Sequence, residues 1–155
     1  MTRWPKTAVA AIAWKRTMPN HVFREYSYDR ETFNDVEFSN DGLTDVAFYH
    51  CTFSRASLQY TEFVDCFFEK CFFESSNLSL VSLSNSKFVD VTFHDSKLLG
   101  INWSGTSGIF SAKFTGCILD NNAFVGMALN NMQFDGCSLK DASFIQCKQI
   151  GRAHV

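Results

Sequence analysis

Residues 48–73 read FYHCTFSRASLQYTEFVDCFFEKCFF and place a Phe or Leu at every fifth position. The same spacing continues in both directions, from Phe23 to Trp103 and, after a slip of one residue, from Ile109 to Phe144. All 25 of these positions are apolar, and they hold fourteen of the 17 Phe residues. A repeat this strict outweighs the local signals in the chain, so it decides the fold.

A period of five matches neither the 3.6 residues of an α-helix nor the two-residue alternation of a strand. The chain must therefore turn a corner after each repeat, so that every large side chain points inward again. Every fourth repeat falls in a column of like side chains, which indicates four repeats, or about 20 residues, per coil. The predicted core columns are Phe33, Phe53, Phe73, Phe93, Phe114 and Phe134, and, after Phe38, Leu58, Leu78, Leu98, Leu119 and Leu139.

The position two residues before each large side chain is mostly small or β-branched, as expected where a corner leaves little room. From Val36 to Cys147 the departures are Asp41, Asn122, Met127 and Met132, and the degenerate early repeats have His21, Tyr26 and Glu31 there. All six cysteines stand at this small position, so we interpret them as small buried residues. Disulfides between axial neighbours such as Cys51 and Cys71 remain an alternative, although they would distort a regular ladder.

The central Phe or Leu, the small residue before it and the polar residues elsewhere resemble the pentapeptide-repeat family, most clearly in residues 48–73 and in CSLKDASFIQC at 137–147. The resemblance implies an all-β fold, a right-handed quadrilateral parallel β-helix (a solenoid) of about six coils with four pentapeptides each. It assigns residues 23–148 to the β-helix. Residues 1–22 are then an N-terminal extension, either a short cap or the product of a start codon assigned too early.

Two segments break the pattern. The slip falls within Ser104–Gly108, whose Gly, Ser and Thr residues favour a bulged corner, with a hinge or contact loop as the alternative. Residues 149–155 carry no repeat, and IGRAHV resembles a translated sequencing adapter. We therefore expect a non-native tail and a natural chain that continues beyond Lys148. In the family this region can hold a dimer interface, so the resemblance leaves a homodimer open.

No catalytic constellation is visible. The four His follow no ligand spacing, no CxxC occurs, and carboxylates at outward positions lack a pocket that would separate their pKa values. We expect no catalytic residue, cofactor or metal site, and a chain that is not an enzyme. The net charge of −2 disfavours direct contact with nucleic acid, and no apolar run is long enough to span a membrane. Cysteine usage favours a reducing, cytoplasmic location.

One candidate surface is acidic. Glu25, Asp45 and Asp65 recur at 20-residue intervals and are expected to stack in one column. The simple interpretation is a solvated face. Because some members of the family imitate duplex DNA, the resemblance also implies a type II topoisomerase, DNA gyrase or topoisomerase IV, as a partner. The quinolone-resistance members carry long projecting loops that this chain lacks.

The other candidate surface is apolar. Tyr60, Leu80 and Leu99 follow one another on one outward face, and clustered apolar groups of this kind can mark a contact with another protein. The sequence therefore favours a non-enzymatic scaffold that acts through protein–protein contact. A structural or secreted-effector module with no topoisomerase target is the alternative.

Overall fold

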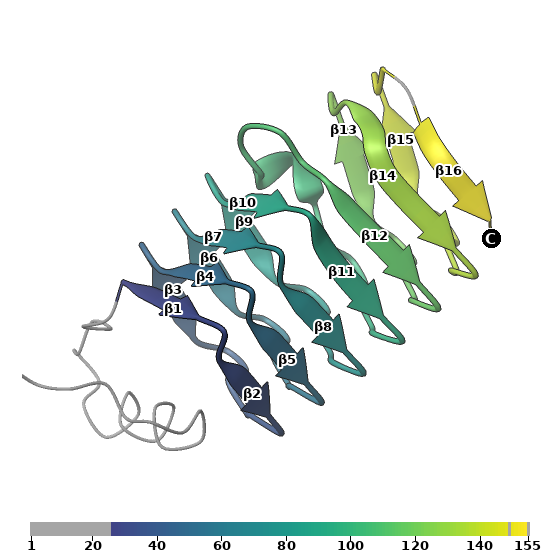
Figure 1. Ribbon diagram of the computed structural model, residues 1–155. Coiled ribbons are helices and arrows are strands. Elements are labelled where there is room, and N and C mark those ends of the chain that lie inside the picture. Colours follow the sequence, from purple (N-terminus) through teal and green to yellow (C-terminus); the bar gives the residue numbers. More distant parts are fainter. Residues whose placement is uncertain (1–25, 149, 155) are drawn as a thin grey trace, which may run out of the picture.

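The computed structural model describes residues 26–148 and 150–154, and the predicted N-terminal extension at 1–22 lies outside them. Within them it confirms an all-β solenoid of parallel sheets with about six coils (Figure 1). None of the described residues forms a helix that is long and apolar enough to cross a membrane.

Parallel strands three to seven residues long cover three sides of the solenoid. The four-stranded sheet contains β1 (Ser27–Asp29), β4 (Ala47–Tyr49), β7 (Phe67–Glu69) and β10 (Lys87–Val89). The seven-stranded sheet contains β2 (Thr32–Asn34), β5 (Thr52–Ser54), β8 (Phe72–Glu74), β11 (Val91–His94), β12 (Ala112–Thr115), β14 (Leu129–Asp135) and β16 (Ile150–His154). The third side holds β3 (Gly42–Thr44), β6 (Glu62–Val64) and β9 (Ser82–Ser84), then a 3₁₀ turn η1 (Trp103–Gly105), then β13 (Ala123–Val125) and β15 (Ser143–Ile145).

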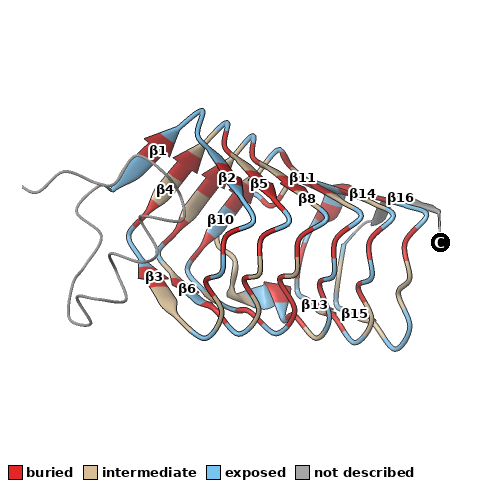
Figure 2. Cartoon of the chain, turned by 90° about the horizontal axis from the view of Figure 1, so that it is seen from below, coloured by how far each residue is buried: buried red, intermediate tan, exposed pale blue. Residues whose placement is uncertain are grey.

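The pairing registers give the length of a coil. Phe53 lies beside Phe73, and on the fourth side, which has only isolated bridges, Ser57 lies beside Asn77. The spacing grows to 21 residues where Phe93 lies beside Phe114. The large side chains consequently stack on their equivalents in the next coil and fill the axis, while the exposed residues lie on the outside (Figure 2).

Ring stacking holds the phenylalanine column together. The Phe53 and Phe73 centroids are 4.6 Å apart at an interplanar angle of 6°, and the Phe93 and Phe114 centroids are 5.0 Å apart at 5°. Such offset stacks are worth about 0.5–1.5 kcal/mol each beyond the area they bury. The leucine column is buried as far as Leu119, whereas Leu139 in the last described coil is only partly buried.

The small inward position does more than save space. The thiol of Cys66 donates to the carbonyl of Leu43 at 3.3 Å, and the hydroxyl of Ser76 donates to Phe53 in the same way at 3.2 Å. Each acceptor belongs to the preceding coil, 23 residues earlier. Cys, Ser and Thr therefore recur here because they are small and can satisfy a buried carbonyl.

The structure corrects the predicted position of the slip. Thr106 still pairs 20 residues away with Ser86, but Ala112 pairs 21 residues away with Val91, so the extra residue lies between Thr106 and Ala112. Ile109, predicted to point inward, is 71% exposed, and Phe110 is buried in its place. An aromatic ring buries more apolar area than Ile, so the loop settles with the ring inside.

Trp103 points inward as predicted, but it lies in the η1 turn instead of a strand. Its indole Nε1 donates to Oδ1 of Asn122 at 2.6 Å, and Nδ2 of Asn122 donates to the carbonyl of Leu98 at 2.6 Å. Asn122, one of the departures from the small position, is therefore the buried partner that the indole requires.

The tail continues the architecture. Strand β16 pairs in parallel with β14, with Phe134 beside Ala153 and a register shift between Leu129 and Gln133. The origin of residues 149–155 as a non-native segment stays a prediction.

Candidate functional site

The predicted apolar surface, here called the apolar patch, consists of Tyr60, Leu80 and Leu99. Tyr60 and Leu80 occupy the same corner of successive coils, and their side chains are 56% and 45% exposed. Leu99 comes one position before the next corner residue, Gly100, and is 36% exposed. The Leu80 side chain lies over Gly100, with Cδ2 only 2.7 Å from where a Cβ would stand, so the patch runs on towards Leu99.

Apolar side chains make this corner unusual, because the other described residues with positive φ are Gly or polar residues, Arg and Lys among them. Corner residues have positive φ throughout the regular coils, and Asn, Asp and Gly tolerate that conformation best. Asn40 and Asn121 occupy the equivalent corner in other coils, whereas Tyr60 and Leu80 adopt φ of 61° and 58°. A bulky side chain there costs roughly 1–2 kcal/mol. Both residues are therefore exposed and unfavourable for their own backbone.

Two members of the predicted acidic column lie within the described residues. Asp45 and Asp65 are exposed on successive coils, and Glu25 lies outside the described residues. The column ends at Asn85, whose Nδ2 donates to Oδ1 of Asp65 at 2.7 Å. One neighbouring carboxylate is paired, because Asp35 accepts from Arg55 at 2.7 and 3.1 Å. This hydrogen bond lowers the pKa of Asp35 below its ordinary value of 3.8.

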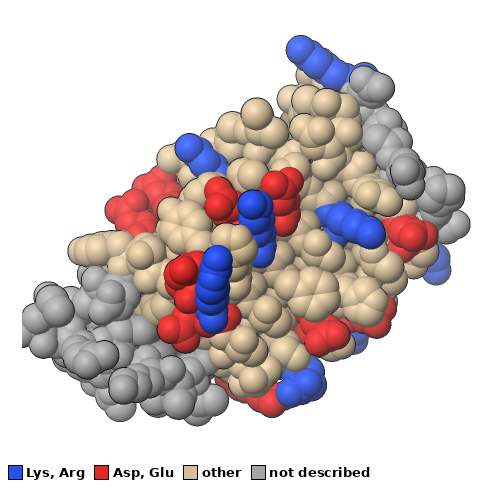
Figure 3. Space-filling view, viewed as in Figure 1, with Lys and Arg blue, Asp and Glu red and all other residues tan. Residues whose placement is uncertain are grey.

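Charge is distributed unevenly along the axis. Residues 26–75 carry ten acidic and three basic side chains, a net charge of −7, whereas residues 76–148 carry five of each. Basic side chains lie among the acidic ones on the face seen in Figure 3. The first described coils are therefore acidic overall, but they do not present an unbroken carboxylate surface.

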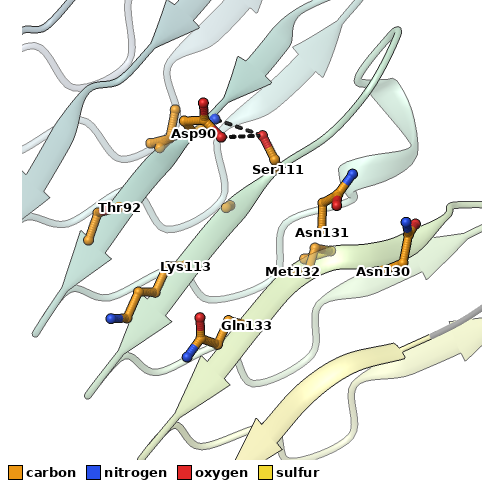
Figure 4. A pocket seen from close by; sticks show the side chains of 10 residues that line it. Asp90, Thr92, Ser111, Lys113, Asn130, Asn131, Met132 and Gln133 are labelled. Carbon is orange, nitrogen blue, oxygen red and sulfur yellow. Dashed lines mark hydrogen bonds between the residues drawn. The ribbon is translucent and has the colours of Figure 1, made fainter.

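Two recesses open where the slip disturbs the coils. The strand recess, about 460 Å³, lies over β11, β12 and the start of β14, and the loop recess, about 420 Å³, lies between the loop before β12 and the segment before β14. Asn130 and Asn131 line both. Figure 4 shows Asp90 and Ser111 joined by hydrogen bonds at one end of the strand recess, with Asn131 across from them on β14. Sequence reasoning missed both recesses.

The cysteine thiols differ in acidity, since the hydrogen bond with Cys117 lowers the pKa of Cys137 to about 6. All six are free thiols, and five are buried. Burial raises the pKa of Cys66 to about 11, so this thiol stays protonated and unreactive near neutral pH. The hydrogen bond with Cys51, together with burial, raises the pKa of Cys71. Among the described residues no group of His, Cys, Asp and Glu is arranged to hold a metal ion.

No family model matches the chain, and no curated protein sequence matches it. Solved structures do. A pentapeptide-repeat protein, Rfr23 from the cyanobacterium Cyanothece 51142, is 12% identical, with a TM-score of 0.46 over 94% of this chain and 99% of its own. QnrB1, a plasmid-mediated fluoroquinolone resistance protein, is 20% identical, with a TM-score of 0.39 over 81% and 74% of the two chains.

HetL, a pentapeptide-repeat protein involved in heterocyst differentiation regulation in the cyanobacterium Nostoc sp. strain PCC 7120, is 8% identical, with a TM-score of 0.21 over 88% and 92% of the two chains. At these identities the similarity concerns the fold alone. The solved structures that this chain is similar to include pentapeptide-repeat proteins and QnrB1.

Proposed function

We propose that this chain is a non-catalytic scaffold that binds another protein, and that the apolar patch is the contact. One observation carries the proposal: Tyr60 and Leu80 are exposed apolar residues held at positive φ, where the same corner elsewhere has Asn, Asp or Gly. Residues that cost the fold stability and leave apolar surface in solvent are explained by a role outside the fold.

The filled axis supports a non-catalytic role. General acid–base chemistry needs titratable groups whose pKa values are shifted apart in a shared pocket. Here the interior is occupied by stacked rings and leucines, and the loop recess is lined by uncharged residues alone. A cytoplasmic location remains part of this proposal, since the six free thiols suit a reducing compartment.

The chemistry of the patch indicates what the partner should offer. An interface of this kind has an apolar centre and a polar rim. Tyr60 belongs to the segment with a net charge of −7, so the complementary surface would place apolar side chains among basic ones. Tyr60 is the expected anchor, because tyrosine is enriched among residues that dominate binding energy.

Residues at the equivalent positions of other coils indicate which substitutions would test the proposal. The triple variant Y60N/L80N/L99S copies Asn40 and Asn121 at the corner and Ser79 at the position of Leu99 one coil earlier. The partner would be identified by photocrosslinking from position 82, an exposed position two residues after Leu80, purified, and titrated against both proteins by calorimetry. We expect the triple variant to lose at least about tenfold in affinity while keeping its melting temperature, since Asn suits positive φ. Unchanged affinity would remove the patch from the proposal.

A second candidate is a DNA mimic that binds a type II topoisomerase. The observation in its favour is the net charge of −7 in residues 26–75. The measurement is gyrase supercoiling activity in the presence of the purified chain, with D45N/D65N as the charge variant. An effect that the variant weakens is expected. No effect at micromolar concentration would end this candidate and favour the structural or secreted-effector alternative.

A further inference from the structure

The hydrogen-bond ladder between coils opens at the slip. In coil four, Lys87 donates its backbone N–H to Cys66 at 2.9 Å, and Val89 accepts from Lys70 at 2.9 Å. One coil later, Gly108, Ile109 and Phe110 make no backbone hydrogen bond with any described residue, and neither does Ala128. Pairing resumes at Ser111, whose N–H donates to the carbonyl of Phe88 at 3.0 Å.

The loop recess lies at this opening. The unpaired segment Gly108–Phe110 lines one side, and Met127, Ala128 and the start of β14 line the other. The side chains of Asn130 and Asn131 have no hydrogen bond within the described structure. Main-chain donors and acceptors without partners are a template for another strand. The recess volume falls in the range of roughly 300–1,000 Å³ that is usual for ligand pockets.

The lining decides what chemistry would fit. No charged residue lines the loop recess, in contrast to Asp90 and Lys113 in the strand recess. Ile109 and Val125, 71% and 37% exposed, offer apolar contacts at its rim. A charged group placed there would lose water without gaining a partner, so the occupant should be neutral.

We propose that the loop recess binds an extended, uncharged peptide segment of another protein through main-chain hydrogen bonds. Gly108 turns the chain with φ of 70°, so Ile109 and Phe110 would pair with about two to three residues of extended peptide, or roughly 10 Å. Alternate side chains of that peptide would contact Ile109 and Val125, and the amides of Asn130 and Asn131 would pair with its backbone. This site goes beyond the proposed function, since it uses other coils and none of the residues of the apolar patch.

The test is fluorescence polarisation of the full chain with a panel of labelled, end-blocked pentapeptides that alternate Thr with Val, Ile, Leu or Phe. Saturable binding by at least one peptide is expected. Methylating its alternate backbone nitrogens should weaken binding at least about tenfold, because the main chain carries the recognition. On binding, hydrogen exchange at the amides of Gly108, Ile109 and Phe110 should slow.

A matched pair of variants distinguishes binding in the loop recess from nonspecific binding to exposed apolar residues. I109D should weaken binding at least about tenfold, whereas I118D, which changes another exposed isoleucine on the fourth side of the solenoid, should stay within about twofold. The proposal is overturned if no peptide in the panel binds below about 1 mM. It is equally overturned if the methylated peptide binds as well as its parent, or if I118D weakens binding as much as I109D.

Discussion

The regular coils, residues 27–99, and the interrupted coils, residues 101–148, solve the same packing problem differently. In the regular coils three sheets run side by side, each with strictly 20-residue registers. The four-stranded sheet then ends at β10 and the three-stranded sheet at β9. Only the seven-stranded sheet, which carries the phenylalanine column, continues through both regions (Figure 1).

The difference shows that a solenoid keeps its register even where some of its sheets end. Each coil contacts only its neighbours, so one unbroken sheet, together with the leucine column and the bridges of the fourth side that also cross the slip, is sufficient to transmit the register. The other sides can then accept a 3₁₀ turn, an extra residue or an open ladder. The 3₁₀ turn, the extra residue and the open ladder all occur in the interrupted coils, which is also where the recesses lie.

The largest expected effect tests whether the phenylalanine column carries the regular coils. Phe73 is fully buried and stacks between Phe53 and Phe93, so Phe73→Ala should cost about 3–5 kcal/mol in the free energy of unfolding. The matched change at the partly buried Phe144 should cost about 1–2 kcal/mol. Urea unfolding followed by circular dichroism measures both, and equal losses would contradict the comparison.

The second prediction concerns the polar pair in the interrupted coils. Asn122→Ala leaves the buried indole N–H of Trp103 and the carbonyl of Leu98 without their partner, at a cost of about 2–3 kcal/mol. The double variant W103F/N122A removes the indole N–H donor together with the side-chain amide that accepts from it. It should therefore be less destabilised than the sum of the single changes, by at least about 0.5 kcal/mol in a double-mutant cycle. Strict additivity would show that the two side chains act independently.

The third prediction compares a glycine from each region. A Cβ on Gly105 in η1 would stand 1.9 Å from the carbonyl oxygen of Leu83, whereas at Gly42 in β3 the nearest atom, the carbonyl oxygen of Glu62, is 3.7 Å away. Gly105→Ala should cost about 1–3 kcal/mol because backbone must move. Gly42→Ala should stay within about 0.5 kcal/mol. Thermal melting of the two variants measures the difference. An unchanged melting temperature for Gly105→Ala would mean that the η1 backbone shifts at little cost.

The smallest expected effect is electrostatic and belongs to the regular coils. The folded pKa of Asp35 lies below its ordinary value of 3.8 because Arg55 donates to it. The pair therefore stabilises the fold above the unfolded pKa, and this contribution is lost as pH falls below 3.8 through the folded pKa. Because both groups are exposed, the effect on the melting temperature should be slight. An NMR titration should show the Asp35 pKa rising in R55Q, and an unchanged pKa would exclude Arg55 as the cause.

Much of the fold could be predicted because the repeat states it many times over. Phe53, Phe73 and Phe93 each indicate the same inward position, so an accidental apolar residue at one position does not change the prediction. The one-residue slip occurs only once, so no other repeat indicates where it lies. Ile109 and Phe110 are adjacent apolar residues, so the spacing alone was equally compatible with either. The burial of Phe110 follows from ring packing against Phe88 and Trp103, contacts that appear only after the coils stack.

The candidate site divides in the same way. Tyr60 and Leu80 could be recognised as outward apolar residues from their phase, but the positive φ that makes them costly is a property of the folded corner. The role of Asn122 had a signal in the sequence, since it departs from the small position 19 residues after a core tryptophan. The loop recess had none, because backbone groups left without partners carry no mark in the amino-acid sequence.

The sequence by itself determined the five-residue period, the 20-residue coil and the identity of the core columns, because burial of large apolar side chains depends mainly on their spacing. The tertiary structure decided where the ladder opens, which residue fills the core at the slip and which corners are strained. Those outcomes depend on the competition between packing and hydrogen bonding among residues about 20 positions apart, which becomes specific only when the coils are stacked.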